Sequence, residues 1–248
     1  MTLREAVAAL AAAGCATPRL DAEVLLAHAL GVERLEFFRR VVEPPGGFEL
    51  LIDRRARREP VAYITGVKGF RNLDLTVDRR VLIPRPETEH LVEAALTLPL
   101  NAAVLDVGTG SGAIALALKD ERPDLRVIAT DISAGALDVA RGNAARLGLD
   151  VTFVEGDLLV GLRADAVVSN PPYVEAGAQL APELAYEPRG ALFGDLYARL
   201  VTQALAVADF VALEIGASQA AEVAGLFPSS TEVVKDLAGH DRVVVWRR

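Results

Sequence analysis

The chain has 248 residues, 52% of them hydrophobic and 24% charged, a composition typical of a well-packed protein with one large domain or a medium and a small one. Its apolar runs are far shorter than the roughly 20 residues that a membrane-spanning helix needs, so we expect no membrane span. Residues 1–80 carry a net charge of +2 and the remainder −10. An acidic second part disfavours stable binding of nucleic acid, whose phosphates require clustered positive charge.

Cysteine and histidine usage limits the chemistry further. Cys15 is the single cysteine, so no internal disulfide can form, and the sequence has neither a CxxC motif nor a histidine pair at ligand spacing, so we expect no metal site. At the N-terminus, Arg4 and Glu5 are followed by alanines rather than by the apolar segment of a signal peptide. We therefore expect a helix there and a cytoplasmic protein.

Residues 1–66 are predicted to form a small helical domain. Apolar side chains recur there at three- and four-residue steps, with Pro18 and Gly31 as breaks, and residues 49–58 have the pattern of a further helix. In residues 67–86 the apolar positions follow a period near two on either side of Arg71-Asn72, which suits a turn. This second segment is predicted to be a β-hairpin linker.

Residues 87–248 alternate helical patterns with short apolar strands. Such alternation predicts an α/β fold, a Rossmann-like doubly wound sheet with helices on both faces. The last two strands are close enough in sequence to form a hairpin, which predicts an antiparallel edge strand. The expected helices cover residues 87–98, 112–120, 133–147, 195–207 and 217–226, and the expected strands 102–107, 126–130, 151–154, 165–169, 209–214, 231–235 and 242–246.

A glycine-rich turn follows the first strand of this alternation. Gly108, Gly110 and Gly112, with Thr109 between the first two, form a GxGxG pattern where glycine permits positive φ and lets a ligand approach the backbone. Dinucleotide enzymes use a similar turn with GxGxxG spacing. Asp106, just before the turn, would repel a pyrophosphate but could accept hydrogen bonds from an ammonium group.

Two further carboxylates follow the next two strands. Asp131 stands 25 positions after Asp106, where a carboxylate can accept both ribose hydroxyls, a geometry shared by sites for NAD and for S-adenosylmethionine. Asp157 follows the third strand and can accept from an adenine amine. Taken alone, each carboxylate could be an ordinary strand-end or cap residue. Together with the glycine turn, the carboxylates predict a binding site for a cationic, phosphate-free nucleoside.

The sequence Asn170-Pro171-Pro172-Tyr173 comes directly after another apolar strand, hence at the carboxyl edge where ligands bind in such sheets. The two prolines stiffen the turn and remove two backbone donors, so that carbonyl oxygens and the Asn170 side-chain oxygen remain as acceptors. Two such acceptors and an aromatic ring suit a flat NH₂ group. Accepting both N–H bonds favours positive charge on the nitrogen as it attacks a methyl group, so the stabilisation grows toward the transition state.

These motifs resemble the class I amino-methyltransferases, and the wider chain is similar to the peptide-chain release factor glutamine N5-methyltransferases, also called the HemK or PrmC family. The likeness rests on the glycine turn and the Asn170 turn, and it covers nearly the whole chain. The other segments that carry it are residues 59–66, 82–89, 186–188, 191–192, 214–216 and 236–242.

The resemblance implies S-adenosyl-L-methionine as cofactor, S-adenosyl-L-homocysteine as product, and the Gly-Gly-Gln glutamine of class I peptide chain release factors as substrate. It implies that the helical domain assists substrate recognition. The amide would lie on Asn170 and Pro171, with Pro172 beside it and Tyr173 flanking it. The implied cofactor contacts are Asp131 at the ribose, Asp157 near the adenine, the turn Asp106, Gly108, Thr109, Gly110 and Gly112, Asn170, and Pro84, Arg85 and Thr88 in a closing segment, residues 83–89.

Three other functions stay open at this stage. An adenine-N6 DNA or RNA methyltransferase would present the same flat NH₂ group to the same turn, although the acidic second part disfavours a backbone groove. A non-catalytic adaptor is disfavoured by the intact Asn170, and a dehydrogenase by Asp106 and the glycine spacing. The basic run at residues 54–58 is either a solvated helix face or a contact with the release factor or the ribosome.

Overall fold

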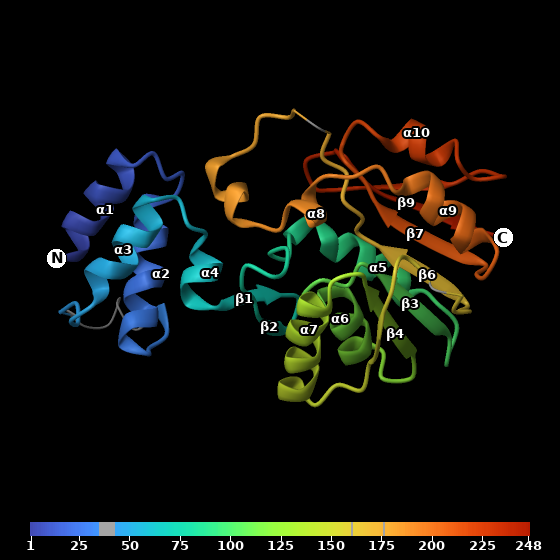
Figure 1. The fold of residues 1–248 in the computed structure, drawn as a ribbon, viewed down its shortest axis with the longest axis horizontal. Coiled ribbons are helices and arrows are strands. Elements are labelled where there is room, and N and C mark those ends of the chain that lie inside the picture. Colours follow the sequence, from blue (N-terminus) through green and yellow to red (C-terminus); the bar gives the residue numbers. More distant parts are fainter. Residues whose placement is uncertain (35–42, 160, 176) are drawn as a thin grey trace. The chain divides into compact units, whose positions relative to one another are not determined.

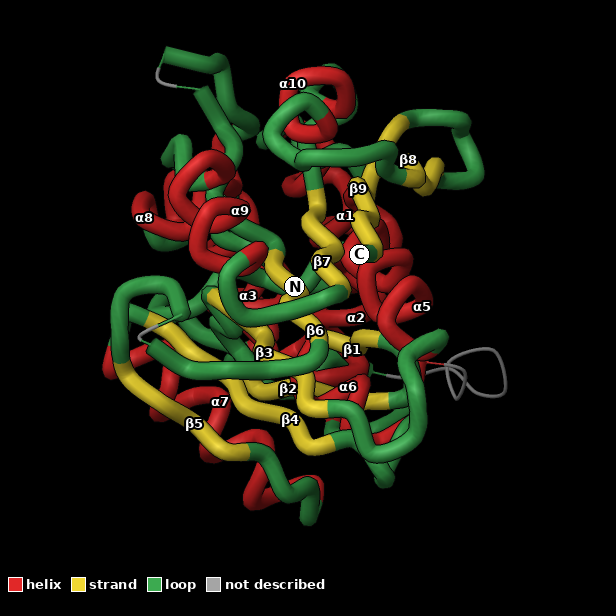
Figure 2. The backbone as a smooth tube through the Cα atoms, turned by 90° about the vertical axis from the view of Figure 1, so that its right-hand side faces the viewer, coloured by secondary structure: helices red, strands yellow, loops and turns green. Residues whose placement is uncertain are grey.

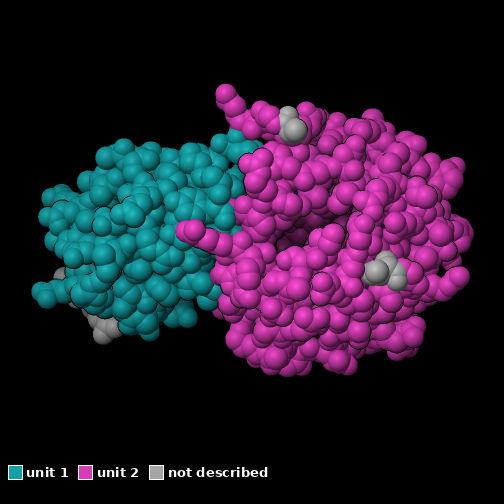
Figure 3. Space-filling model, in the orientation of Figure 1, with its two compact units in different colours: residues 1–67, 180–186 teal, residues 68–179, 187–248 magenta. Residues whose placement is uncertain are grey.

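The computed structural model describes residues 1–34, 43–159, 161–175 and 177–248. The chain forms two compact units, coloured separately in Figure 3. Unit 1 comprises Met1–Val67 together with Leu180–Tyr186, and unit 2 comprises Lys68–Gln179 and Glu187–Arg248. Among the described residues, none of the helices has the length and apolar character needed to cross a membrane. The predicted domain limits at residues 66 and 86 stay a prediction.

Unit 1 is helical, as its periodicity predicts. A capping box between Thr2 and Glu5 begins the first helix, and the second begins with Pro18 and ends at Gly31, which adopts the left-handed conformation common at helix ends. Their apolar faces share a core that includes Leu10. The elements are α1 (Leu3–Ala12), α2 (Pro18–Leu30), α3 (Phe48–Ala56), α4 (Val61–Thr65) and the 3₁₀ helix η3 (Pro182–Tyr186).

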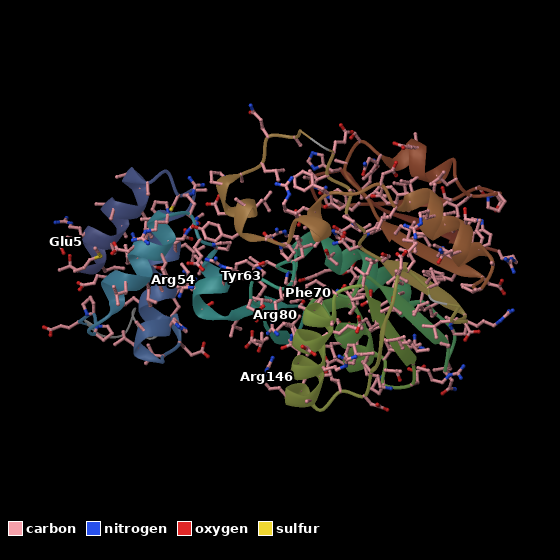
Figure 4. All side chains as sticks on the ribbon, viewed as in Figure 1. Glu5, Arg54, Tyr63, Phe70, Arg80 and Arg146 are labelled. Atoms are coloured by element: carbon pink, nitrogen blue, oxygen red, sulfur yellow. The ribbon has the colours of Figure 1, made fainter. Side chains whose placement is uncertain are left out.

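The basic run at residues 54–58 is largely occupied by partners within unit 1. Arg54, labelled in Figure 4, donates to both carboxylate oxygens of Glu59 at 2.8 and 2.9 Å. Arg55 is buried and donates to Asp21 at 2.7 Å and to Glu183 at 3.0 Å, and Arg58 donates to Glu183 at 2.8 Å. The arginines therefore fix the segment Leu180–Tyr186 within this unit, which a local sequence pattern could not reveal.

Unit 2 begins with the predicted hairpin. Strands β1 (Val67–Phe70) and β2 (Leu73–Thr76) form a two-stranded sheet joined at Arg71-Asn72, with Arg71 in the left-handed region at φ +49°. The paired strands end at Thr76, well before the predicted limit at residue 86. Asn143 accepts from the main-chain N–H of Thr76 and donates to its carbonyl, so the hairpin is held on helix α7 (Ala134–Leu147).

A seven-stranded sheet in the order β5-β4-β3-β6-β7-β9-β8 forms the centre of unit 2 (Figures 1 and 2). The pairs from β5 to β7 are parallel, and β9 is antiparallel to both of its neighbours. The antiparallel strand thus lies one place inside the edge, with β8 outermost. The strands are β3 (Ala103–Val107), β4 (Arg126–Asp131), β5 (Thr152–Glu155), β6 (Ala166–Ser169), β7 (Phe210–Glu214), β8 (Glu232–Lys235) and β9 (Asp241–Arg247).

Helices cover both faces of this sheet, as predicted for a doubly wound fold. The remaining elements are η2 (Pro86–Thr88), α5 (Glu89–Leu96), α6 (Ala113–Glu121), α8 (Arg189–Leu192), α9 (Tyr197–Leu205) and α10 (Ala220–Ala224). Successive residues of β3 point to the two faces, because Val104 packs in one apolar cluster with α5 and α6, and Leu105 packs in a second with α9 and α10. The short helices η3 and α8 are absent from the sequence-based prediction.

The strand order reverses between β3 and β6. From β3 the chain winds outward through β4 to β5, and it then returns to β6 on the other side of β3 and continues to β7. The register pairs Val107 with Thr130 on one side and with Ser169 on the other, so three strand ends meet at one level. Ligands in open α/β sheets bind at such a switch point.

Candidate active site

The turn after β3 is shaped by three glycines with positive φ, Gly108 at +73°, Gly110 at +55° and Gly112 at +85°. A Cβ atom added at Gly108 or Gly110 would meet no heavy atom of the described residues within 4 Å, whereas one at Gly112 would lie 2.9 Å from Leu116 Cδ1. The main-chain N–H groups of Gly108 and Thr109 both donate to the Thr130 carbonyl at 2.9 Å. The first two glycines therefore open the backbone to a ligand, and the third allows close helix packing.

A cavity of about 410 Å³ lies at this edge, and a hollow is visible in the surface of unit 2 in Figure 3. It lies within the size range of small-molecule sites. A recess of about 50 Å³ shares Gly108, Gly110 and Asn170 with it, and Pro84, Arg85, Thr88 and Thr109 also line this recess. The predicted residues on the large cavity are Gly108, Gly110, Asp131, Asp157, Asn170, Pro171 and Pro172.

Asp106 lies beneath the glycine turn and lines neither space. Its Oδ2 accepts from the Thr109 hydroxyl at 2.6 Å and from the Ala115 N–H at 3.2 Å, and so ties the turn to the start of α6. Its Oδ1 is buried without a hydrogen-bond partner among the described residues. Burial raises the pKa of the Asp106 carboxyl to about 7, against the lowering effect of these hydrogen bonds.

Asp131 ends β4 and faces the large cavity. Its Oδ2 accepts from the Gly110 N–H and its Oδ1 from the Ser133 N–H, both at 2.9 Å. A carboxylate has about four lone-pair positions, so each oxygen keeps one acceptor position for a hydroxyl group. Asp131 thus joins the glycine turn to the next strand end while remaining available to a ligand.

Asp157 lies at a more solvent-exposed part of the cavity. Its Oδ2 accepts from Arg199 at 2.6 Å, and 55% of each of the two side chains is exposed. Both residues line the cavity. An exposed ion pair of this kind contributes little stability, so Asp157 can exchange Arg199 for another donor at small cost.

Residues 170–173 follow β6 directly, and the first three of them form the opposite wall. Asn170 donates from Nδ2 to the Thr88 hydroxyl oxygen at 3.2 Å, and its Oδ1 accepts no hydrogen bond from the described residues. Pro171 is buried, and it and Pro172 line the large cavity. A Cβ atom at Gly194 would lie 2.9 Å from Pro172 Cγ, so this turn is closely packed from behind.

Tyr173 turns away from the cavity, which it does not line. Its hydroxyl donates to Glu214 Oε1 at 3.4 Å, and its carbonyl accepts from Gln219 at 3.4 Å. Burial, together with the nearby Glu214 carboxylate, raises the pKa of the Tyr173 hydroxyl to about 12. The predicted contact of this ring with a flat NH₂ group stays a prediction.

Two buried glutamates support the site, and neither appears among the predicted site residues. Glu214 ends β7 with 1% of its surface exposed, and its Oε2 has no hydrogen-bond partner among the described residues. Glu187 accepts from the Ile83 N–H at 3.0 Å and forms an ion pair with Arg85. It thereby ties the predicted closing segment to the chain before Pro188, which lines the cavity. Both glutamates fall within segments that carry the family resemblance, the one signal that could have found them.

The groups at this edge fit a cationic nucleoside. Gly108 and Gly110 leave open space beside the backbone, and Asp131 keeps acceptor positions. Under the same turn, Asp106 has a buried oxygen without a hydrogen-bond partner in the described part of the chain. These are acceptors for hydroxyl and ammonium groups rather than donors for a pyrophosphate. Among the described residues, no cluster of three metal-ligating side chains is present.

Comparison with known proteins identifies both parts of the chain. The PrmC N-terminal domain matches residues 2–66, and the methyltransferase small domain matches residues 87–203. A methyltransferase structure from Pyrococcus furiosus, 20% identical, aligns with a TM-score of 0.58 over 79% of this chain and 98% of that one. At this identity it supports the fold alone, and the predicted Rossmann-like α/β fold is confirmed.

Two relatives carry the same name. The release factor glutamine methyltransferase of Neisseria gonorrhoeae is 43% identical over 253 residues, which is 92% of this chain and 93% of the relative. That of Mycolicibacterium smegmatis is 47% identical over 205 residues, which is 77% of this chain and 72% of the relative. The predicted family is confirmed, and the chain belongs to the release factor glutamine methyltransferases.

Proposed function

We propose that this methyltransferase transfers a methyl group from S-adenosyl-L-methionine to the side-chain amide nitrogen, N5, of a glutamine in a class I peptide chain release factor. The glutamine is that of the Gly-Gly-Gln motif. The names of the relatives support a release factor as substrate. The observation that carries the proposal is the Asn170 amide beside the glycine turn, whose nitrogen donates to Thr88 while its oxygen accepts no hydrogen bond from any residue that the structure describes.

The cofactor would lie along the ends of β3, β4 and β5. Asp131 would accept the ribose hydroxyls, and Asp157 the adenine amine in exchange for Arg199. Gly108 and Gly110 would let the methionine part approach the backbone. Below the turn, the Asp106 oxygen that has no partner among the described residues would add negative potential for the ammonium group. Bound S-adenosylmethionine supplies a methyl carbon that the neighbouring sulfonium makes electrophilic.

The residues of the second wall would make an amide nitrogen reactive. Its lone pair is delocalised into the carbonyl group, so positive charge develops on nitrogen as the N–C bond forms and the C–S bond breaks. Asn170 Oδ1 and the Pro171 carbonyl would accept one N–H each and stabilise that charge more in the transition state than in the ground state. One N–H proton then leaves to water, so the chain needs no residue acting as a strong base.

The remaining predicted residues take supporting parts in this proposal. Pro172 and Tyr173 stiffen the turn, the former against Gly194 and the latter through Glu214 and Gln219. Pro84 and Arg85 belong to the closing segment, which Glu187 holds. The helical unit would assist recognition of the release factor, with Arg57 the exposed member of its basic run.

Label transfer tests the proposal. The full chain is incubated with methyl-labelled S-adenosylmethionine and, in parallel, a class I release factor, duplex DNA and RNA. We expect label in the release factor alone, and none in a release factor whose Gly-Gly-Gln glutamine is replaced by alanine. Label on adenine, or label that survives the glutamine substitution, would overturn the proposed substrate.

A further inference from the structure

The smaller recess at the glycine turn, of about 50 Å³, differs from the large cavity in the charge of its lining. Among the described residues that border this recess, Arg85 alone carries a charge. The large cavity is bordered instead by the carboxylates of Asp131 and Asp157 and by two other arginines. The recess is therefore suited to a small group that carries negative charge.

The proposed cofactor branches at its sulfonium, and two of its branches already have positions. The methyl group has to face the Asn170 amide, and the ribose has to reach Asp131 at the end of β4. Gly108, Gly110 and Asn170 border both spaces, so a sulfonium held at the turn can extend its third branch into the recess. This third branch is an amino acid, which ends in an ammonium group and a carboxylate group.

The two charges of this head group require partners of opposite sign. Asp106 lies under the turn, and its Oδ1 has no hydrogen-bond partner among the described residues, so it suits the ammonium group. Arg85 supplies positive charge for the carboxylate group. The start of α6 adds positive potential to the recess, which is also bordered by Ser111, Ala113 and Ile114.

Arg85 is held in place by the buried Glu187. The two residues form an ion pair, and the Glu187 side chain, which is 1% exposed, also accepts from the Ile83 N–H at 3.0 Å. The ion pair uses one of the five N–H groups of a guanidinium, and the Arg85 side chain donates to no other group in the described part of the chain. A guanidinium fixed in this way loses little conformational entropy when it binds a second carboxylate.

We propose that Arg85 is a cofactor-binding residue that holds the carboxylate group of the amino-acid part of S-adenosylmethionine, while Glu187 fixes the guanidinium. This inference rests on the proposed function, and it assigns the recess to the amino-acid head group. S-adenosyl-L-homocysteine carries the same head group and binds there in the same way. A nucleoside without the carboxylate group loses this contact.

Decarboxylated S-adenosylmethionine is the probe for this contact, because it keeps the sulfonium and the ammonium group and lacks only the carboxylate group. Its dissociation constant and that of S-adenosylmethionine are measured by calorimetry at pH 8, where the Asp106 carboxyl is largely ionised. For the natural chain we expect the decarboxylated ligand to bind about 10- to 100-fold more weakly. Arg85→Gln should weaken S-adenosylmethionine binding by a similar factor and should discriminate between the two ligands by less than about threefold.

Two further variants separate charge, geometry and folding. Arg85→Lys keeps a positive charge but has no planar fork to bridge Glu187 and a ligand, so its discrimination should be intermediate. Arg80→Gln is the matched control, because Arg80, labelled in Figure 4, borders the large cavity and is paired with Asp78. It should discriminate as strongly as the natural chain. Decarboxylated ligand that binds Arg85→Gln and the natural chain within about twofold shows that the variant is folded.

The outcomes separate this inference from the proposed function. A natural chain that binds neither ligand contradicts the proposed function and this inference with it. A natural chain that binds both ligands equally, or an Arg85→Gln variant that discriminates as strongly as the natural chain, contradicts the assignment of Arg85 to the carboxylate group and leaves the proposed methyl transfer intact.

Discussion

The two sides of the sheet edge in unit 2 are built in different ways. On the side of β3, β4 and β5, the cavity is bounded by backbone and by carboxylates that keep acceptor positions, such as Asp131. On the side of β6 and β7, the wall is supported by side chains behind it, because Asn170 donates to the buried Thr88 and Tyr173 donates to the buried Glu214.

This difference follows from what each side would hold. A charged nucleoside brings many polar groups, so accessible acceptors at several strand ends suffice to bind it. A neutral amide offers only two N–H bonds, so its acceptors must be fixed in orientation by groups behind them. Substitutions on the first side should therefore change cofactor affinity, and substitutions on the second side should change the rate.

The largest effect is expected for Asn170→Ala. Loss of the side-chain acceptor should lower kcat by about 10²–10³-fold, because the stabilisation of charge in the transition state is lost. Cofactor affinity, measured by calorimetry, should change by less than about threefold. Asn101→Gly, at an exposed position with φ +61° outside the cavity, is the control and should be fully active. A parallel loss of affinity and rate in Asn170→Ala would erase the distinction between the two sides.

The glycine turn offers a matched pair of substitutions. Gly110→Ala directs a methyl group into open space at a positive φ and should weaken cofactor binding about tenfold or more. Gly112→Ala places its methyl group 2.9 Å from Leu116 Cδ1, so it should lower the free energy of unfolding by about 1–3 kcal/mol.

The control for this pair is Gly142→Ala, at an exposed position inside α7 with open space around it. It should be neutral or stabilising by up to about 1 kcal/mol, because alanine favours the helix. Thermal unfolding and calorimetric titration distinguish the three variants. Equal effects of Gly110→Ala and Gly112→Ala on cofactor binding would contradict the separate purposes assigned to them.

Asp131→Ala should weaken cofactor binding by about 1–3 kcal/mol, since two ribose hydroxyls would lose their acceptors. Asp131→Asn keeps one acceptor oxygen for the Gly110 N–H and should lose less. Calorimetry at constant pH measures both. An affinity unchanged in the alanine variant would mean that the ribose lies elsewhere.

Stability should depend on pH through Glu214. Its pKa is raised from 4.5 to about 7 in the folded chain, so the unfolded chain releases this proton first as pH rises. The free energy of unfolding should therefore fall between about pH 4.5 and pH 7, by on the order of 1–3 kcal/mol. Glu214→Gln should flatten that decrease, and Glu232→Gln, on an exposed strand residue, should not. Denaturant titrations at a series of pH values provide the test, and a slope unaltered in Glu214→Gln would refute it.

The smallest effect is expected for Asp157→Asn, less than about 1 kcal/mol in cofactor affinity, because this carboxylate is exposed and already paired with Arg199. Arg199→Ala frees the carboxylate and should strengthen binding slightly. Opposite signs of these two small changes in calorimetry would support an adenine contact, and identical signs would argue against it.

The sequence predicts the first side of the edge better than the second. The glycine turn and Asp131 are each set by residues next to them along one strand end, so local spacing reveals them. The hydrogen bonds of the second side join residues that are far apart in the sequence. Thr88 accepts from a residue 82 positions away, Glu187 from one 104 positions away and Glu214 from one 41 positions away, so no local pattern links these pairs. The motif predicts that Asp106 faces a ligand, whereas the side chain lies under the turn, where its Oδ2 accepts hydrogen bonds from Thr109 and Ala115.

The same reasoning applies to the fold. Alternating helices and strands predict the doubly wound sheet, since periodicity is local. The place of β9 inside the edge depends on pairing with β7, and the assignment of Leu180–Tyr186 to unit 1 depends on Glu183 meeting Arg55 and Arg58. Both are long-range contacts that spacing does not encode.

Mass mapping of the methylated product tests the central claim most directly. A class I release factor treated with the natural chain and S-adenosylmethionine is digested, and its peptides are fragmented to locate the added group. We predict one methyl group on the side-chain nitrogen of the Gly-Gly-Gln glutamine, and none after treatment with Asn170→Ala loaded with cofactor. A methyl group on any other residue, or equal methylation by that variant, would contradict the account of Asn170 as the acceptor that activates an amide.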